Sequence, residues 1–348
     1  MNGKLTTTPG NEKSATRIPP LLSIICPIRN EDVHIVDCLQ SIMNQDYDPT
    51  RIEILVVDGM SNDRTREIVK ELQKTDARIR LLDNPSRIVP AAMNIGIRHA
   101  RGEVIVRVDG HAVISENYLT RCIEVLQKTG ADCVGGPIDS INRTYLGRAI
   151  ALAMSFPFGM GDSRFRTSNF EGYVDTLAFG AYRHAVFERI GLFDEELVRC
   201  QDDELNYRLR KFGGTIYMTP QIRSRYFPRA NLRKLWRQFF QYGFWKVRVL
   251  QKHMRMMQPR QFAPGAFVGA LLVTLSAGMV AKPLLMAFGG ILATYLLANL
   301  LASGVLALKR GFRYFPLLPV VFGLLHFGYG AGFLLGLLKF SGRWKNSA

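Results

Sequence analysis

The segment VIVRVDGHAV (Val104–Val113) is the most informative stretch of this chain for predicting its fold class. It begins as an apolar run around a single arginine, which is typical of a buried strand. The run ends on Asp109, Gly110 and His111, so a carboxylate and an imidazole follow the strand directly. In an open parallel sheet, ligands bind beyond the carboxyl ends of the strands. The segment therefore predicts a sheet that carries a polar site at this edge.

The same alternation of short apolar runs and helical patterns continues on both sides of this segment. The apolar runs predict strands at 21–26, 52–57, 78–82, 103–108 and 132–136. The helical patterns lie at about 33–43, 62–74, 89–100 and 115–128. Strands that alternate with helices of this length indicate βαβ units with right-handed crossovers. We therefore expect an α/β fold, with a mostly parallel, Rossmann-like sheet and helices on both of its faces.

Charge divides the chain into two parts. All 29 Asp and Glu residues lie at or before Glu204, whereas 24 of the 45 Lys and Arg residues lie in that part and 21 follow it. The net charge is therefore about −5 for the first part and about +21 for the second. This asymmetry indicates two regions with different roles. The five cysteines form no CxxC pair, so we interpret them as reduced structural thiols.

We divide the chain into four segments. Residues 1–20 are polar, lack the apolar core of a signal peptide and are expected to form a disordered leader. Residues 21–220 form the predicted α/β domain. Residues 221–260 hold 11 Lys or Arg and no acid, with aromatic residues between them, and predict basic amphipathic helices at a membrane interface. Residues 261–348 predict a membrane domain.

Three uncharged blocks define this membrane domain, at 262–281, 283–308 and 316–338. Each has the length of about 20 residues that a spanning helix needs. The rule that basic residues stay on the cytoplasmic side places 221–260 and Lys309, Arg310 and Arg313 in the cytoplasm, although it leaves Arg343 and Lys345 outside if all three blocks span. We therefore expect a protein of the inner membrane whose catalytic domain faces the cytoplasm. Because the basic segment leads directly into these blocks, we expect it to bind membrane and not nucleic acid.

Polar residues follow three of the predicted strands, in PIRNED (27–32), DGMSNDRT (58–65) and DGH (109–111). At one sheet edge, carboxylates such as Glu31, Asp58 and Asp109 can accept hydrogen bonds from ribose hydroxyls or a base. Neither GxGxxG nor GxxxxGK with Ser or Thr occurs, which argues against a dinucleotide site or a P-loop. In an extended segment, Asp109 and His111 would project to the same side and suit a divalent metal.

These motifs and their order resemble family 2 glycosyltransferases of the GT-A fold. They are most similar to the membrane-associated branch of bacterial exopolysaccharide, or succinoglycan-type, biosynthesis. The matching stretches are CPIRNE (26–31), VVDGMSNDRT (56–65), RIVPAAMNIGIRHARGEVIVRVDGHA (87–112), AFGAYRHAVFERIGLFDEE (178–196) and QDDELNYRLR (201–210). The resemblance covers about 21–248 and implies transfer of a sugar from a nucleotide donor with inversion. The usual Asp-x-Asp motif is Asp109-Gly110-His111 here, which implies that Asp109 and His111 hold Mn²⁺ or Mg²⁺.

The resemblance also implies roles for individual residues. The family's base is the Asp of Glu-Asp-x-Asp-Leu-x-x-Arg, which appears here as Gln201-Asp202-Asp203-Glu204-Leu205 with Arg208 in the last place. A carboxylate can take the proton of an attacking hydroxyl, so we assign Asp202 as the catalytic base and Asp203 as the second candidate. An acidic helix N-terminus, favoured by the helix dipole, explains the same residues without excluding catalysis. The residues expected to bind the nucleotide sugar are Pro27, Asn30, Glu31, Asp58, Ser61, Asp63, Asp109 and Gly180.

On the acceptor or lipid side we place Arg208, Gln238 and Trp236. A sugar on a lipid pyrophosphate is anionic at its head and apolar in its tail, which suits basic residues beside spanning helices. Processive members of the family carry Gln-x-x-Arg-Trp, whereas Gln238 is followed by Phe239-Phe240-Gln241-Tyr242. We therefore expect a hexosyltransferase that adds a single sugar.

The predicted reaction is metal-dependent transfer from a nucleotide sugar, with a UDP-sugar as the first choice, to a saccharide linked to polyprenyl pyrophosphate. The reaction would take place at the cytoplasmic face, in the biosynthesis of exopolysaccharide or another cell-surface glycan. Two alternatives stay open: a polyprenyl-phosphate hexose synthase, and a membrane-anchored protein that binds nucleotide sugars without turnover.

Overall fold

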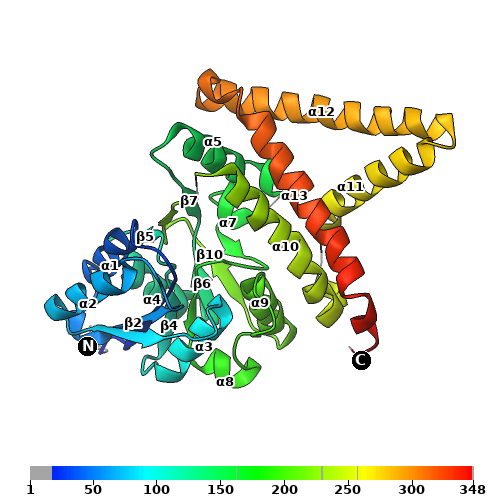
Figure 1. Ribbon diagram of the computed structural model, residues 1–348. Helices are drawn as coiled ribbons and strands as arrows, with labels where there is room; N and C mark the ends of the chain where they lie inside the picture. The colour runs from blue at the N-terminus through cyan, green and yellow to red at the C-terminus, as the bar shows by residue number, and fades with distance from the viewer. Residues whose placement is uncertain (1–17, 162, 229, 257, 347–348) are drawn as a thin grey trace, which may run out of the picture.

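The computed structural model describes residues 18–161, 163–228, 230–256 and 258–346 (Figure 1). The leader expected at 1–20 lies almost entirely outside these residues. An α/β unit occupies the blue-to-green half of the chain, and long helices follow it from yellow-green to red.

The main sheet is built around the strand that precedes the DGH segment. Eight strands of the described chain form it, in the order β3-β2-β1-β4-β9-β6-β10-β8. Its first four members run parallel: β3 (Ile79–Asp83), β2 (Ile52–Asp58), β1 (Leu22–Ile28) and β4 (Val104–Arg107). Each lies within two residues of a strand expected from the sequence, as does β6 (Cys133–Gly135). The expected α/β sheet is therefore confirmed.

The other half of the sheet mixes directions. The strand β9 (Ala181–Arg183) lies between β4 and β6 and is antiparallel to both. Beyond β6, β10 (Ile216–Met218) is parallel to it, and β8 (Gly172–Tyr173) forms the antiparallel edge. A separate small sheet has the order β5 (Ala112–Ile114), β11 (Ser224–Tyr226) and β7 (Ile138–Ser140). The DGH segment is thus the connection from the main sheet to the small one.

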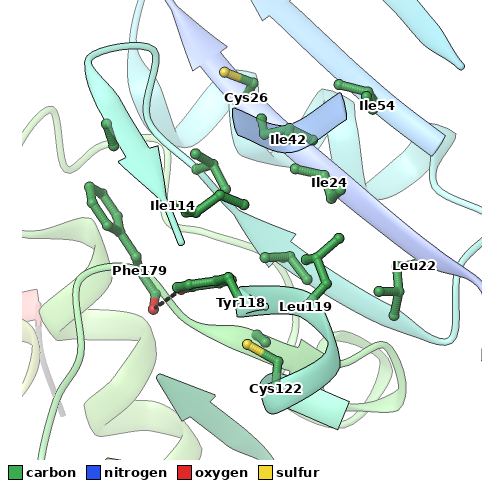
Figure 2. Packing of buried hydrophobic residues seen from close by; sticks show 14 of the residues in the cluster. Leu22, Ile24, Cys26, Ile42, Ile54, Ile114, Tyr118, Leu119, Cys122 and Phe179 are labelled. Carbon is green, nitrogen blue, oxygen red and sulfur yellow. Dashed lines mark hydrogen bonds between the residues drawn. The ribbon is translucent and has the colours of Figure 1, made fainter. Parts of the chain in front are cut away.

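Helices cover both faces of the main sheet. They are α1 (Ile35–Met43), α2 (Thr65–Thr75), α3 (Val89–His99), α4 (Tyr118–Thr129), α8 (Ala185–Ile190) and α9 (Gln201–Lys211). Alternate residues of β1 enter two cores: Leu22 and Ile24 pack with residues of α1 and α4, whereas Ile25 packs with residues of α3, α8 and α9. Figure 2 shows the first of these cores, with Tyr118 and Leu119 of α4 beside β1. Burial on both faces explains why β1 is apolar except at Ser23, whose hydroxyl donates a hydrogen bond to the buried Glu53 at 2.6 Å.

Between β7 and β8 the chain forms the helices α5 (Tyr145–Met154), α6 (Pro157–Met160) and α7 (Arg164–Thr167). After β11 comes α10 (Leu232–Lys252). Within the described residues, three later helices are long and apolar enough to cross a membrane: α11 (Pro259–Gly278), α12 (Lys282–Arg310) and α13 (Leu318–Lys339). In Figure 1, α11 and α12 extend away from the α/β unit, while α13 returns to it.

The amphipathic helix α10 packs along α13 (Figure 1). The backbones approach so closely that a Cβ atom added at Gly332 would lie 2.0 Å from the carbonyl oxygen of Phe240, and one at Gly243 would lie 2.0 Å from that of Tyr329. Leu235 and Phe239, on the apolar face of this helix, are buried in a core with residues of α5 and α13. The apolar face of α10 therefore serves protein packing, while Arg233, Lys234 and Arg237 are exposed.

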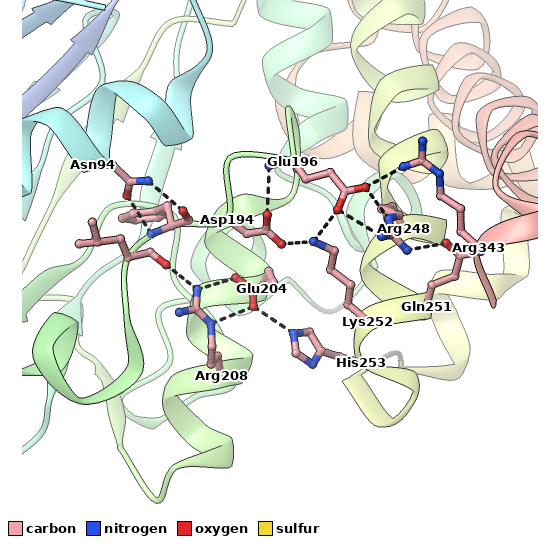
Figure 3. A network of polar contacts seen from close by, with 12 residues as sticks. Asn94, Asp194, Glu196, Glu204, Arg208, Arg248, Gln251, Lys252, His253 and Arg343 are labelled. Atoms are coloured by element: carbon pink, nitrogen blue, oxygen red, sulfur yellow. Dashed lines mark hydrogen bonds and ion pairs between the residues drawn. The ribbon is translucent and has the colours of Figure 1, made fainter. Parts of the chain in front are cut away.

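An ion-pair network joins the end of α10 to the α/β unit (Figure 3). The carboxylate of Glu196, in the loop before α9, lies 2.7 Å from both Arg248 and Lys252 of α10 and 2.9 Å from Arg343 near the C-terminus. The hydrogen bond from Arg248 is the main reason that the pKa of Glu196 falls to about 2. The network fixes α10 against the loop that leads into the acidic motif.

Candidate active site

The loops after β1 and β2 are hydrogen-bonded to one another. The backbone N–H of Asn30 donates to Ser61 Oγ at 2.8 Å, and Asn30 Oδ1 accepts from the N–H of Asn62 at 3.0 Å. The N–H of Glu31 donates to Thr65 Oγ1 at 2.8 Å. Asn30 has a φ of 55°, in the left-handed region that Asn tolerates better than most residues. The structure therefore brings together the two motifs that the sequence places at this edge.

Asp58 is buried and stabilises the loop that follows β2. Its carboxylate accepts hydrogen bonds from the N–H and Oγ of Ser61, at 3.0 and 2.5 Å, and pairs with Arg66 at 2.6 Å. Asp63 accepts from the N–H of Thr65 at 3.0 Å and from that of Asp32 at 3.4 Å. Both carboxylates thus shape the loop, and Pro27 lies within β1 opposite Val57.

The DGH segment is a turn, which corrects the expectation of an extended chain. The N–H of Ala112 donates to the carbonyl of Asp109 at 2.8 Å, and a Cβ at Gly110 would lie 2.7 Å from Ile28. Asp109 is held by Arg107, with Nε and Nη2 at 2.8 and 3.2 Å from its two oxygens. His111 Nδ1 lies 3.0 Å from Glu31 Oε1. The positions of the Asp109 and His111 side chains are therefore determined by two different partners, Arg107 and Glu31, and not by the alternation of side chains along a strand.

The donor set at this turn fits a metal that is shared with a substrate. Burial raises the pKa of Asp109, but the charge and hydrogen bonds of Arg107 lower it further, so the carboxyl stays ionised as a ligand must be. The described residues contain no group of three or more His, Cys, Asp or Glu around one point. Mg²⁺ is commonly bound by one or two protein ligands together with substrate phosphates. Asp109 and His111 are the side chains of this turn that could supply such ligands, in place of part of their contacts with Arg107 and Glu31.

The acidic motif reaches the same place through α9. This helix starts directly after Cys200, whose φ of 63° turns the chain into the helix. Arg107 Nη1 lies 3.9 Å from Asp202 Oδ2, so the arginine that grips Asp109 also faces Asp202. Burial raises the pKa of Asp202 above its ordinary value; Arg107 opposes the shift, and the charges of Asp203 and Asp109 add to it. A carboxylate of raised proton affinity suits a general base.

Asp203 and Glu204 have other partners. Asp203 pairs with the buried Lys246 of α10 at 2.5 Å and accepts from Thr176 Oγ1 at 3.1 Å. Burial lowers the pKa of Lys246, but Asp203 raises it more, so the lysine stays charged. Glu204 is buried between Arg208 and His253, at 2.8 and 3.0 Å (Figure 3). Of the three acids, Asp202 is the one without a dedicated cation of its own.

A cavity of about 470 Å³ opens beside Asp202 and Asp203, between α7, α9 and α10 on one side and α11, α12 and α13 on the other. Its walls include cations that the sequence analysis did not single out: Arg164, Arg166, Arg210, Lys246 and Arg260. Lys246 could have been identified from the sequence because it is a single cation on the apolar face of α10. Similarly, a charged residue inside an apolar strand was the signal for Arg107.

The residues expected on the acceptor side are placed differently. Among the described residues that line the cavity, Arg208, Gln238 and Trp236 do not occur. Arg208 Nη2 donates hydrogen bonds to the carboxylate of Glu204 and to the carbonyl of Leu192, each at 2.8 Å. Gln238 donates to the hydroxyl of Tyr242, a cavity residue, at 2.9 Å, and Trp236 packs near Gly328 of α13. Gly180 lies beside β4, where its carbonyl accepts from the N–H of Arg107 at 3.2 Å.

A family model described as glycosyl transferase family 2 matches residues 23–191. Succinoglycan biosynthesis protein ExoA of Rhizobium meliloti (strain 1021) is 33% identical over 328 residues, covering 92% of this chain and 96% of that protein. A Methanococcus voltae protein is 29% identical over 334 residues, covering 93% of this chain and 99% of its own. Its name is dolichyl N-acetyl-alpha-D-glucosaminyl phosphate 3-beta-D-2,3-diacetamido-2,3-dideoxy-beta-D-glucuronosyltransferase.

Two solved structures share the GT-A architecture. The mannosyltransferase PcManGT from Pyrobaculum calidifontis, in complex with GDP-Man and Mn²⁺, has a TM-score of 0.57 and 20% identity, over 89% of this chain and 87% of its own. TarS 1-349 of S. aureus has a TM-score of 0.52 and 17% identity, over 90% of each chain. Identities this low show the fold alone.

Proposed function

Because this chain belongs to family 2 of the glycosyltransferases, we propose that it transfers one sugar, with inversion, from a nucleotide sugar to a lipid-linked saccharide at the inner membrane. The observation that carries the proposal is the position of Arg107, which contacts Asp109 at the sheet edge and faces Asp202 at the start of α9. Arg107 thus connects Asp109, which follows β4, with Asp202, which belongs to a motif far along the chain.

On the donor side, the loops after β1 and β2 and the DGH turn would hold the nucleotide. Asn30, Glu31, Ser61 and Asp63 fix these loops through the hydrogen bonds described above. Asp109 and His111 would hold Mn²⁺ or Mg²⁺, which supplies positive charge to the diphosphate when it is bound. A neighbour in complex with GDP-Man and Mn²⁺ supports this class of donor, and a UDP-sugar is our first candidate.

On the acceptor side, Asp202 would take the proton of the acceptor hydroxyl as the hydroxyl oxygen attacks the anomeric carbon. The bond from that carbon to the nucleoside diphosphate would break at the same time, and the diphosphate would leave with the electron pair. One displacement of this kind inverts the configuration at that carbon. Arg107 would act as a positioning residue, because its guanidinium lies 3.9 Å from Asp202 and its charge opposes the rise that burial causes in the pKa of Asp202. Asp203, which is engaged by Lys246, is less suited to accept a proton.

The helices α11 and α12 support a lipid-linked acceptor and a cytoplasmic catalytic unit, whereas α13 returns to the α/β unit and keeps Arg343 on the same side as Glu196, its partner. The basic residues Lys309, Arg310 and Arg313 lie at the end of α12 and just after it, as expected for a cytoplasmic connection. The name of the Methanococcus relative includes a dolichyl phosphate-linked sugar, which supports the same class of acceptor. The name of the Rhizobium relative supports a role in exopolysaccharide biosynthesis.

A polyprenyl-phosphate hexose synthase is the second candidate. It would use a bare lipid phosphate as acceptor, and the arginines that line the cavity beside Asp202 favour an anionic group there. Such a reaction needs no base for a hydroxyl. The identity of the product therefore separates the two candidates.

The test is to incubate membranes that contain the protein with a panel of labelled nucleotide sugars, with and without Mn²⁺, and to identify the labelled lipid. We expect one label to enter a lipid-linked saccharide and the Asp202→Asn variant to lose this transfer. A lipid carrying a single sugar on its phosphate would favour the second candidate. Binding of nucleotide sugar without any transfer would instead indicate a binding protein.

A further inference from the structure

The cavity beside Asp202 has two kinds of wall. Its volume of about 470 Å³ lies within the range of ordinary ligand sites. One wall is cationic and comes mainly from α7, α9 and the start of α11, and the other is apolar and comes from α11, α12 and α13. A ligand that fills this space must therefore combine an anionic part with an apolar part.

The cationic wall holds more positive than negative charge. Its five cations are Arg164, Arg166, Arg210, Lys246 and Arg260, and its three acids are Asp175, Asp202 and Asp203. Lys246 is neutralised by Asp203, and Arg260 lies 3.8 Å from Asp175. Arg164 and Arg166 have aromatic partners instead, with their guanidinium groups 4.1 Å from the ring of Phe170 and 5.4 Å from that of Tyr226. Apart from the two ion pairs, Arg164, Arg166 and Arg210 stand against one acid, Asp202, which leaves the excess of positive charge.

Arg166 has a further property that points to a ligand. Its Nη1 atom is buried and has no hydrogen-bond partner among the described residues. A buried guanidinium nitrogen without a partner costs free energy unless a ligand or ordered water satisfies it. Phosphate oxygens suit this role, because guanidinium groups bind them with charge-assisted hydrogen bonds.

The apolar wall is part of the membrane domain and is held in place. It includes Ala263 and Phe267 of α11, Tyr295 of α12 and Leu325 of α13. His326 of α13 fixes it, with Nε2 2.8 Å from the carbonyl of Phe158 and Nδ1 3.1 Å from the hydroxyl of Tyr295. Polar side chains inside membrane helices are costly and usually serve a function. Here they tie two membrane helices to α6, which precedes the arginines of α7.

The helix α11 shows the direction in which a ligand would lie. Arg260, Ala263 and Phe267 all line the cavity, at spacings of three and four residues that place them on one face of the helix. The rise of 1.5 Å per residue carries this face from charged to apolar over about 10 Å. Under the proposed orientation, this direction runs from the cytoplasmic start of α11 toward the interior of the membrane.

We infer that this cavity binds the lipid part of the acceptor, with phosphate against Arg164 and Arg166 and the first isoprene units against the membrane helices. The inference rests on the proposed function and specifies its acceptor as a polyprenyl chain that carries phosphate. The three parts of such a molecule, sugar, phosphate and prenyl chain, would meet Asp202, the arginines and the apolar wall. The membrane helices are then part of the active site and not only an anchor.

The experiment measures binding of a fluorescent C15 prenyl pyrophosphate to the full-length protein in nanodiscs, with EDTA present to disable the metal-dependent donor site. Arg166→Gln is compared with Arg121→Gln, which alters a surface arginine that pairs with Glu124 on α4. Ala263→Trp, which fills the apolar part of the cavity, is compared with Ala266→Trp on the exposed side of the same helix. Binding of a nucleotide in the presence of Mn²⁺ shows that each variant is folded.

We expect Arg166→Gln and Ala263→Trp each to weaken probe binding about tenfold or more, the scale of a lost charge-assisted hydrogen bond, and the two control variants to bind like the unmodified protein. Inorganic pyrophosphate and farnesol should each compete less well than unlabelled farnesyl pyrophosphate. Equal binding in each variant and its control would overturn the inference, as would competition by inorganic pyrophosphate as strong as that of the prenyl compound. Because the assay needs no turnover, absence of sugar transfer alongside the expected binding pattern would reject the proposed function and leave the lipid site standing.

Discussion

Arg107 Nη1 lies 3.9 Å from the carboxylate of Asp202, and the other guanidinium nitrogens of Arg107 hold Asp109. Arg107 is almost fully buried within β4, so its charge depends on these two acids for compensation. Under the proposed function, Asp109 belongs to the donor side and Asp202 to the acceptor side. The buried guanidinium of Arg107 then lies between the donor side and the acceptor side, where the sugar would be transferred.

The first prediction concerns the base. Asp202→Asn should lower turnover by a factor of about 10² to 10⁴, the contribution typical of general base catalysis. Binding of the nucleotide donor should persist, because Asp202 lies on α9 and not in the loops after β1 and β2. Radiolabel transfer and nucleotide binding by calorimetry measure the two effects separately. Asp203→Asn is the matched variant, and an effect on turnover as large as that of Asp202→Asn would move the base assignment to Asp203.

The second prediction concerns pH. Because burial raises the pKa of Asp202 and Asp203 adds to the shift, transfer should fall with decreasing pH at a pH above the ordinary range for aspartate. Asp203→Asn removes a negative neighbour and leaves the positive Lys246, and both changes favour the ionised form of Asp202. The acid limb of kcat against pH should therefore move to lower pH. A shift to higher pH would show that Asp202 is not the group that titrates.

The third prediction concerns the metal. His111→Asp restores the usual Asp-x-Asp pattern and replaces an imidazole with a hard oxygen ligand, which should shift the preference from Mn²⁺ toward Mg²⁺. The measurement is transfer, with Mn²⁺-dependent nucleotide binding as a second readout, across titrations of both metals. Because His111 also contacts Glu31, His111→Gln serves as the control for loss of that contact. Full activity with an unchanged metal preference in His111→Asp would remove the case for the imidazole as a ligand.

The parallel strands could be predicted because a strand buried on both faces is mostly apolar, as are β1 apart from Ser23 and β4 apart from Arg107. The strands β8, β9, β10 and β11 have two or three residues each, too few to show a period, and each pairs with strands that lie far from it in the sequence. The DGH turn was expected to be extended because sequence spacing does not show that Gly110 packs against Ile28. Contacts between residues far apart in the sequence therefore determine these features, which the local sequence pattern does not predict.

The residues of the candidate site that directly follow strands or belong to ordered motifs could be predicted. Those whose role depends on contacts with distant residues were harder to predict. Asp109 and Asp202 were both singled out, but the arginine between them was not, since its partners lie in different motifs. The amphipathic pattern of α10 does not show whether lipid or protein covers its apolar face. The signal for protein was in α13, where Gly328, Gly332 and Gly336 recur every four residues, a spacing that allows close helix packing.

The last prediction concerns the network around Glu196, which joins α10 to the loop before α9. The pKa of Glu196 in the folded protein is about 2, chiefly through the hydrogen bond from Arg248, whereas an unperturbed glutamate has a pKa of about 4.3. A lowered pKa stabilises the folded state above the unfolded pKa, and this contribution is lost as the pH falls through the folded value. Glu196→Gln should therefore lower the thermal midpoint at pH 7, and the difference from the unmodified protein should shrink steadily below about pH 4.3.

The measurement is thermal unfolding in nanodiscs at a series of pH values, with Glu188→Gln of the exposed face of α8 as the control. Raising the salt concentration should weaken the effect only in part, because Glu196 is partly buried and meets three cations at once. A difference between Glu196→Gln and the unmodified protein that stays constant from pH 7 to pH 3 would show that the glutamate acts by packing and not by its charge. Such a result would also remove the electrostatic reason for α10 to stay fixed against the loop that leads to Asp202.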